Sequence, residues 1–202
     1  MKILLPENSS DITLLQYQKY YDLLQRDGLD TNQHNVRKIQ IFTGLKPNEI
    51  DCLSKKEIDE MLTQIDIALN TPVEFINRFT IEGIEFGFIT LDKITGAEYF
   101  DLSKYKEDVE TLHNLIAILF RPIKDKDAFG NYSVMPYNGT SEWAELMKLT
   151  PMNVVNGALF FFLNLSRELV NYIQRYTDQE QAKEEWQVTT SLSGDGMQPL
   201  TN

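Results

Sequence analysis

A helix that is apolar on every side constrains this chain more than any other feature of its sequence. Thr150-Pro151 predicts where it begins, because threonine can cap a helix and proline at the first helical position gives up no hydrogen bond. The helical pattern continues past Tyr176, a length of roughly 40 Å at about 1.5 Å per residue. The run from Leu159 to Leu163 is apolar and covers all of its faces. We therefore expect protein to surround the first half of this helix, while its charged second half projects.

The first 70 residues carry the start and stop signals of several helices. A first helix is predicted after the capping residues at 9–11 and ends at Gly28, and a second runs over 31–43 with a glycine at its C-terminal cap. Ser54 and Glu57 form a capping box, in which the hydroxyl and the carboxylate satisfy backbone donors at the start of a further helix.

The middle of the chain changes from helical spacing to alternation. From Glu74 to Ile89, aromatic and β-branched residues alternate with polar ones around Gly83, which predicts a hairpin of two short strands. A helix over about 108–119 follows and ends at Arg121-Pro122. Residues 125–139 are polar and contain glycines, so they indicate either an exposed loop or a second hairpin.

These patterns predict a mainly α fold with a small β-hairpin element, arranged as a single domain like a helical bundle over residues 1–187. It comprises an N-terminal helical unit over 1–70, the hairpin over 74–90, and a helical core with the long helix over 104–187. Residues 188–202 have turn chemistry and little apolar content, and we expect them to form a flexible tail.

Length and charge restrict the partners and the compartment. A chain of 202 residues can bury a core without disulfides or metal. Its formal net charge of −11 argues against nucleic acid or an anionic membrane surface, because binding to either needs basic groups. Cys52, the single cysteine, lies between Ile50 and Leu53, and we expect a buried, unreactive thiol in a reducing compartment. No cleavable signal or bilayer-spanning apolar run is visible, so we expect a soluble protein.

The sharpest candidate for chemistry is the acidic, glycine-containing stretch EGIEFGFITLDKITGAEYFDL at residues 82–102. Asp92, Glu98 and Asp101 are oxygen ligands of the kind that Ca²⁺ uses, but they lack the spacing of a calcium-binding helix-loop-helix. In the structural alternative, Asp92 begins a turn, a glycine relieves it, and Asp101 or Ser103 caps the next helix. We favour this alternative and predict no metal site.

The remaining reactive residues form no recognisable catalytic set. His34 and His113 each lack a second histidine or cysteine at metal-ligand spacing. Arg121 at a predicted helix end is better placed to bind the terminal carbonyls than a phosphate. Phosphate-binding glycine loops and a nucleophile elbow do not occur in the sequence. We therefore expect no enzymatic activity and no cofactor.

Two segments are candidates for binding a partner protein. Phe160, Phe161 and Phe162 either fill the chain's own core or face a neighbouring protomer, since a helix that is apolar all round is expected in both cases. In the tail, Met197 and Leu200 either belong to an exposed linker or become ordered in a partner's groove.

Several segments resemble a family of morphogenesis and virion structural proteins of tailed bacteriophages, which includes marine, Bacteroidetes-infecting and crAss-like phages. They are ITLLQYQKYYDLL, FGFITLDKITGAEYFDL, LIAILFRPI, PMNVVNGALFFFLNLSREL and the tail motif SGDGM, and together they cover most of the chain. The resemblance implies a non-enzymatic virion protein that is assembled in the host cytoplasm. Its partners would be other phage structural proteins and further copies of itself.

The resemblance leaves two roles open. The first is a structural component near the head-tail connector or inside the particle. The second is a tail assembly chaperone that is absent from the mature virion. A metal-dependent hydrolase that uses the acidic stretch is the competing enzyme hypothesis.

Overall fold

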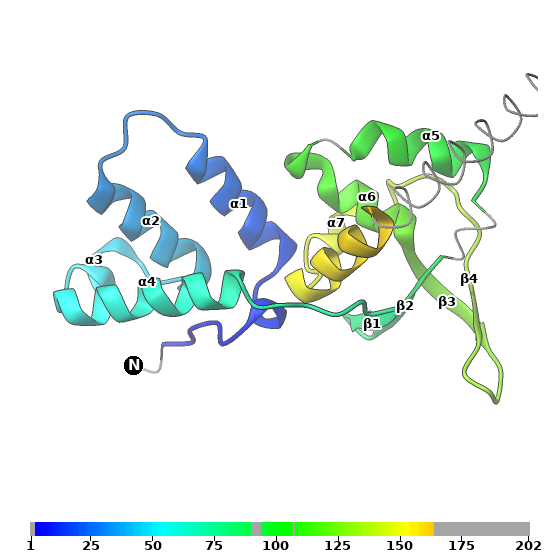
Figure 1. Ribbon diagram of the computed structural model, residues 1–202, viewed down its shortest axis with the longest axis horizontal. Coiled ribbons are helices and arrows are strands. Elements are labelled where there is room, and N and C mark those ends of the chain that lie inside the picture. Colours follow the sequence, from blue (N-terminus) through cyan, green and yellow to red (C-terminus); the bar gives the residue numbers. More distant parts are fainter. Residues whose placement is uncertain (1–2, 90–93, 107, 164–202) are drawn as a thin grey trace, which may run out of the picture. The chain divides into compact units, whose positions relative to one another are not determined.

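A computed structural model describes residues 3–89, 94–106 and 108–163 (Figure 1). The chain divides into two compact units, Met1–Leu159 and Phe160–Asn202, and only residues 160–163 of the second are described. The predicted boundary at 187/188 and the predicted tail therefore lie outside the described residues. The fold is mainly α with a small antiparallel sheet, as the sequence predicts.

The N-terminal part is helical, and its boundaries follow local capping signals. The α-helix after residues 9–11 begins later than predicted: these residues form a separate 3-10 turn, Ile12 is extended, and Thr13 caps the helix with Gln16. The second predicted helix has the expected bounds, and Gly44 ends it with a φ of 72°. The elements are η1 (Ser9–Asp11), α1 (Leu14–Leu24), α2 (Thr31–Thr43), α3 (Pro47–Ile50) and α4 (Lys55–Leu69).

Packing joins α1 to α2 and α2 to α4 (Figure 1). Leu14, Ile39 and Ile65 are fully buried between these helices. Cys52 is exposed, so the prediction of a buried thiol is wrong. Ile50, the last residue of α3, is the residue of this turn that enters the core.

The sheet has four antiparallel strands in the order β1-β2-β3-β4. The sequence predicted the first pair, and it gave the second pair as one of two alternatives. Of the two alternatives for residues 125–139, the second hairpin is confirmed. Its first strand begins immediately after a helix, so Arg121-Pro122 lies within a strand instead of at the helix end. The bounds are β1 (Arg78–Ile81), β2 (Ile84–Phe88), β3 (Phe120–Lys126) and β4 (Tyr132–Val134).

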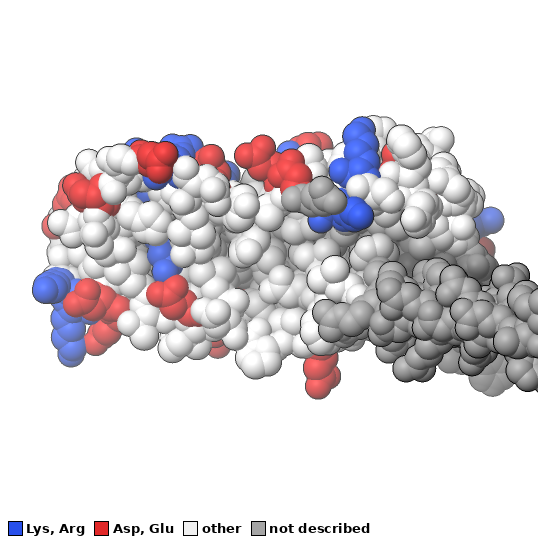
Figure 2. Space-filling view, turned by 45° about the horizontal axis from the view of Figure 1, so that its top comes forward, with Lys and Arg blue, Asp and Glu red and all other residues white. Residues whose placement is uncertain are grey.

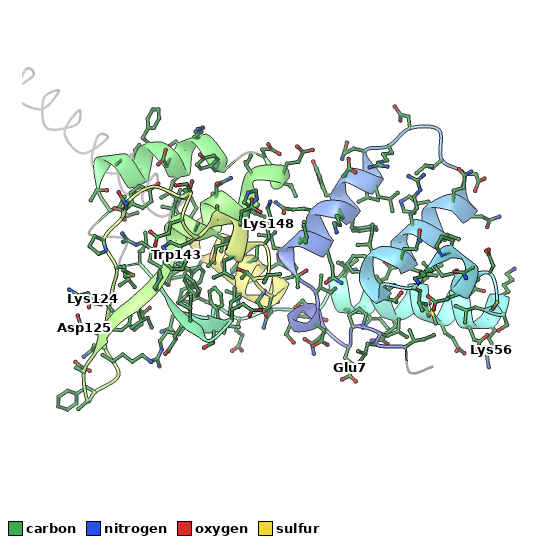
Figure 3. The ribbon with its side chains drawn as sticks, turned by 180° about the vertical axis from the view of Figure 1, so that it is seen from behind. Glu7, Lys56, Lys124, Asp125, Trp143 and Lys148 are labelled. Atoms are coloured by element: carbon green, nitrogen blue, oxygen red, sulfur yellow. The ribbon has the colours of Figure 1, made fainter. Side chains whose placement is uncertain are left out.

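One side of the sheet is lined by aromatic rings. Phe86 and Phe120 are completely buried, and Phe79 packs against both. The half-buried indole of Trp143, which is labelled in Figure 3, meets Phe86 edge-on. Edge-to-face contacts of this kind are the favoured geometry of aromatic rings. The helices of this part are α5 (Gly96–Tyr105), α6 (Leu112–Leu119) and α7 (Ala144–Met147), with η3 (Val109–Thr111) before α6.

Residues 152–163 form the described part of the predicted long helix. Gly157 lets this helix lie directly against the segment before β1, because a Cβ there would stand 2.6 Å from the carbonyl oxygen of Glu74. The backbone around the helix start also pairs with the N-terminal part, through a bridge between Thr13 and Pro151. Within the described residues, no helix is long and apolar enough to cross a membrane.

Charged side chains are mixed on the face drawn in Figure 2. Acidic and basic residues form small separate groups there, and the described residues of this face show no continuous patch of one sign.

Candidate functional site

The candidate site is the segment of residues 160–163, which we call the aromatic segment. The helix changes character just before it: Ala158 is fully buried, whereas Phe160 is 66% exposed and Leu163 is 62% exposed. Phe161 is 37% exposed, and Phe162 is half-buried. The described residues therefore do not enclose Phe160 and Leu163, and the alternative that this run faces a neighbouring protomer stays a prediction.

The physical reason lies in where the core ends. Met152, Val154, Val155 and Ala158 enter the core of the first unit. After Leu159, Phe160 and Leu163 are exposed. Phe160 and Leu163 are three positions apart, so they project from the same side of the helix. Burying a side chain of this size against a partner contributes about 1.5–3 kcal/mol.

Within the described residues, the acidic stretch contains the start of a helix. Thr95 caps α5, and the carboxylate of Glu98 accepts hydrogen bonds from the Thr95 N–H and hydroxyl, both at 2.6 Å. The predicted caps, Asp101 and Ser103, lie inside α5, so that assignment is wrong. Asp92 lies outside the described residues. The described ranges contain no cluster of three or more histidine, cysteine, aspartate or glutamate side chains suited to a metal.

Glu98 is also half of a buried ion pair. Its second oxygen lies 2.9 Å from Arg121 Nη2, and the two side chains are only 2% and 14% exposed. The guanidinium of Arg121 also faces the ring of Tyr137, whose hydroxyl donates to Asp101. Burial and the neighbouring Asp101 raise the pKa of Tyr137 above its usual range. The prediction that Arg121 binds helix-terminal carbonyls is wrong; it joins β3 to α5.

A small cleft of about 230 Å³ opens beside this ion pair, between Glu98, Arg121 and the residues of β4. Its two charged groups neutralise each other, and the Glu98 carboxylate already accepts from Thr95. Both oxygens of Glu98 are therefore engaged, whereas Nε of Arg121 is buried and has no hydrogen-bond partner among the described residues. The cluster is suited to holding α5 on the sheet.

The sequence did not indicate three aromatic residues that are more than two thirds exposed. Tyr99 and Phe100 on α5 are 69% and 71% exposed, and Phe129 in the turn between β3 and β4 is 92% exposed. Asp127 fixes that turn by accepting from the N–H groups of Phe129 and Asn131, each at 2.9 Å. The sequence DAFGN at residues 127–131, which contains a glycine between two alternating runs, is typical of such a turn.

No protein-family model, curated protein or solved structure matches this chain. Of the sequence-predicted partner-binding residues, the structure describes Phe160, Phe161 and Phe162. Met197 and Leu200 lie outside the described residues.

Proposed function

We propose that this chain is a non-enzymatic structural or assembly protein of a tailed-phage particle. In this proposal it binds other virion proteins, including further copies of itself, through the aromatic segment. The observation that carries the proposal is the exposure of Phe160 and Leu163 directly after a helical stretch that is buried as far as Ala158.

Single exposed apolar side chains are ordinary on soluble proteins, whereas a group of them marks a binding surface. In the aromatic segment, Phe160, Phe161 and Leu163 are all more than a third exposed. A neighbouring protein in an assembly can cover such a group. The sequence resemblance to virion proteins supplies the class of assembly.

The first experiment is mass spectrometry of purified virions, with the copy number referred to the portal protein. A fixed stoichiometry is the expected result and supports a structural role. Absence from virions, together with co-purification with a tail protein from infected cells, would replace this role by that of the assembly chaperone. Absence from both would overturn the proposal.

The second experiment tests the aromatic segment itself. Phages that carry Phe160→Ser with Leu163→Ser should incorporate fewer copies of the chain, because the contact loses its apolar area. The matched control is Phe129→Ser, which removes a more exposed aromatic side chain from the turn between β3 and β4. If the wild type, the double variant and Phe129→Ser are incorporated equally, residues 160–163 do not form the contact with the other virion proteins.

A further inference from the structure

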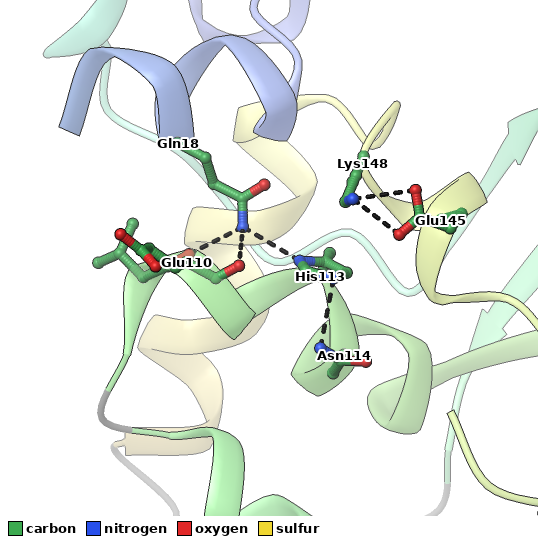
Figure 4. A network of polar contacts seen from close by, with 7 residues as sticks. Gln18, Glu110, His113, Asn114, Glu145 and Lys148 are labelled. Atoms are coloured by element: carbon green, nitrogen blue, oxygen red, sulfur yellow. Dashed lines mark hydrogen bonds and ion pairs between the residues drawn. The ribbon is translucent and has the colours of Figure 1, made fainter. Parts of the chain in front are cut away.

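One side chain of α1 reaches across to the segment that begins α6. Gln18 Nε2 lies 2.8 Å from the carbonyl oxygen of Val109, 2.9 Å from that of Glu110 and 3.2 Å from Nδ1 of His113 (Figure 4). These contacts connect positions that are far apart in the sequence. They hold the middle of α1 to η3 and to the first turn of α6.

The contacts determine the protonation state of His113. The two carbonyl oxygens can only accept, so the amide group of Gln18 that faces them must be the donating NH₂. Nδ1 of His113 faces the same NH₂ and must therefore present its lone pair. With Nδ1 as the acceptor, the imidazole is neutral and carries its proton on Nε2, and the Asn114 amide beside Nε2 must then turn its oxygen toward the ring. A proton added to Nδ1 would turn an acceptor into a second donor facing Gln18.

The charges around His113 also oppose protonation. Burial lowers the pKa of His113 below its ordinary value of 6.5, and the ammonium of Lys148 lowers it further. Glu145 and the backbone carbonyl of Glu110 act in the opposite direction. Glu145 is exposed, and its carboxylate is already bound by Lys148 at 2.7 and 2.9 Å.

The other helix packed against α6 is α5, whose charged side chains include Lys104, hydrogen-bonded to the Tyr105 hydroxyl. On α5, Glu98 is paired with Arg121, and Asp101 accepts from Tyr137. On α6 itself, Asn114 Nδ2 lies 3.3 Å from Nε2 of His113 and is uncharged.

We propose that Gln18 and His113 form an acid-sensitive latch, which holds α1 to η3 and α6 at neutral pH and releases it when His113 is protonated. A second attachment remains during release, because it uses backbone atoms only. It consists of the hydrogen bonds from Leu14 N to the Thr150 oxygen, at 2.9 Å, from Leu15 N to the Lys148 oxygen, at 2.8 Å, and from Met152 N to the Ile12 oxygen, at 2.8 Å. Release therefore frees the middle of α1 while its start stays attached.

The direction of the pH effect follows from linkage. The folded chain lowers the pKa of His113 below its ordinary value of 6.5. The closed state is therefore favoured when the pH is above 6.5. This contribution is lost as the pH falls below that value, by up to about tenfold in the opening equilibrium per pH unit for one proton. The inference does not depend on the proposed virion role.

Hydrogen–deuterium exchange of the full chain tests the latch. We expect protection factors, corrected for intrinsic rates, to fall about tenfold between pH 7 and pH 5 in peptides from α1 and from residues 109–119. His113→Gln cannot gain a proton and should abolish this pH dependence. His34→Gln, which replaces the chain's other histidine, is the matched control and should retain it.

Gln18→Ala provides an independent measurement if His113→Gln does not fold. It should lower protection in the same peptides already at pH 7 and leave little further change at pH 5. Two results would overturn the latch: protection in the wild type that is unchanged between pH 7 and pH 5, or an equal pH dependence in His113→Gln.

Discussion

Two helices of this protein begin with the same capping box and differ in what surrounds it. At α4, Glu57 accepts from the Ser54 N–H at 2.7 Å and from its hydroxyl at 2.6 Å; at α5, Glu98 accepts from Thr95 at 2.6 Å in both cases. Glu57 is exposed to solvent. Glu98 is 2% exposed and carries an additional contact to Arg121 on β3.

The difference separates two ways of holding a helix. The capping box of α4 involves only Ser54 and Glu57, so its loss should destabilise little beyond the first turn of that helix. The box of α5 connects the helix to the sheet through a charge that is removed from water. A buried charge is costly once it loses its partner, whereas an exposed one is solvated. The sheet-containing part should therefore respond much more strongly to single substitutions.

The largest effect is expected from Arg121→Met, which leaves the buried Glu98 without its counter-charge. We expect a loss of about 3–5 kcal/mol in the free energy of unfolding, measured by urea denaturation. Adding Glu98→Gln should recover most of the loss, because the amide is neutral and can still accept from Thr95. A double variant no more stable than Arg121→Met would show that the unpaired charge is not the cause.

An exposed ion pair is the matched control for this substitution. On α4, Nζ of Lys56 lies 3.6 Å from Oε1 of Glu60, and the two side chains are 86% and 65% exposed. Lys56→Met should change the free energy of unfolding by less than about 0.5 kcal/mol. A loss comparable to that of Arg121→Met would remove the contrast between the two parts.

The next effect concerns Gly87 in β2, which lies under the ring of Tyr132 from β4. A Cβ at Gly87 would stand 2.3 Å from the ring, and hydrogen bonds from the Tyr132 hydroxyl to the Phe88 and Asn77 oxygens, at 3.0 and 3.1 Å, keep the ring in place. Gly87→Ala should cost about 1–3 kcal/mol by overpacking. In a Tyr132→Ala background the same substitution should cost much less, and an unchanged cost would contradict the steric explanation.

These non-local contacts explain which parts of the fold the sequence predicted. The box of Ser54 and Glu57 and the cap at Gly44 depend on residues at most a few positions apart, and both were predicted correctly. Thr95 and Glu98 have the same spacing as Ser54 and Glu57, so the sequence equally indicates a capping box there. The carboxylates of this stretch were instead considered as metal ligands. Nothing local indicates that Glu98 meets Arg121, because their contact depends on how α5 packs over β3.

The same limit applies to the candidate site. The sequence identified Phe160, Phe161 and Phe162 and left open whether they belong to the core. Their exposure depends on where the core ends, and this is set by contacts such as that of Gly157 with Glu74. The start of strand β3 was missed for a related reason: its first residues continue the apolar run of α6, so the change from helix to strand has no periodic signal.

A smaller effect is expected at the local box. Ser54→Ala should cost about 1 kcal/mol at pH 7, because the start of α4 loses its cap. The hydrogen bonds from Ser54 also lower the pKa of Glu57 below its ordinary value of 4.5. Their contribution is present above that value and lost as the pH falls. The difference in urea midpoint between the wild type and Ser54→Ala should therefore become smaller below about pH 4.5. A difference that does not change with pH would show that the ionised carboxylate of Glu57 does not stabilise the start of α4.

The smallest effect on folding is expected at the aromatic segment. Phe160→Ser should change the free energy of unfolding by less than about 0.5 kcal/mol, because its side chain is already 66% exposed. Val155→Ala, in the buried stretch of the same helix, should cost more than about 1 kcal/mol in the same urea titration. If Phe160→Ser were as destabilising as Val155→Ala, Phe160 would belong to the chain's own core. If it leaves stability unchanged while incorporation into virions falls, Phe160 acts in binding a partner.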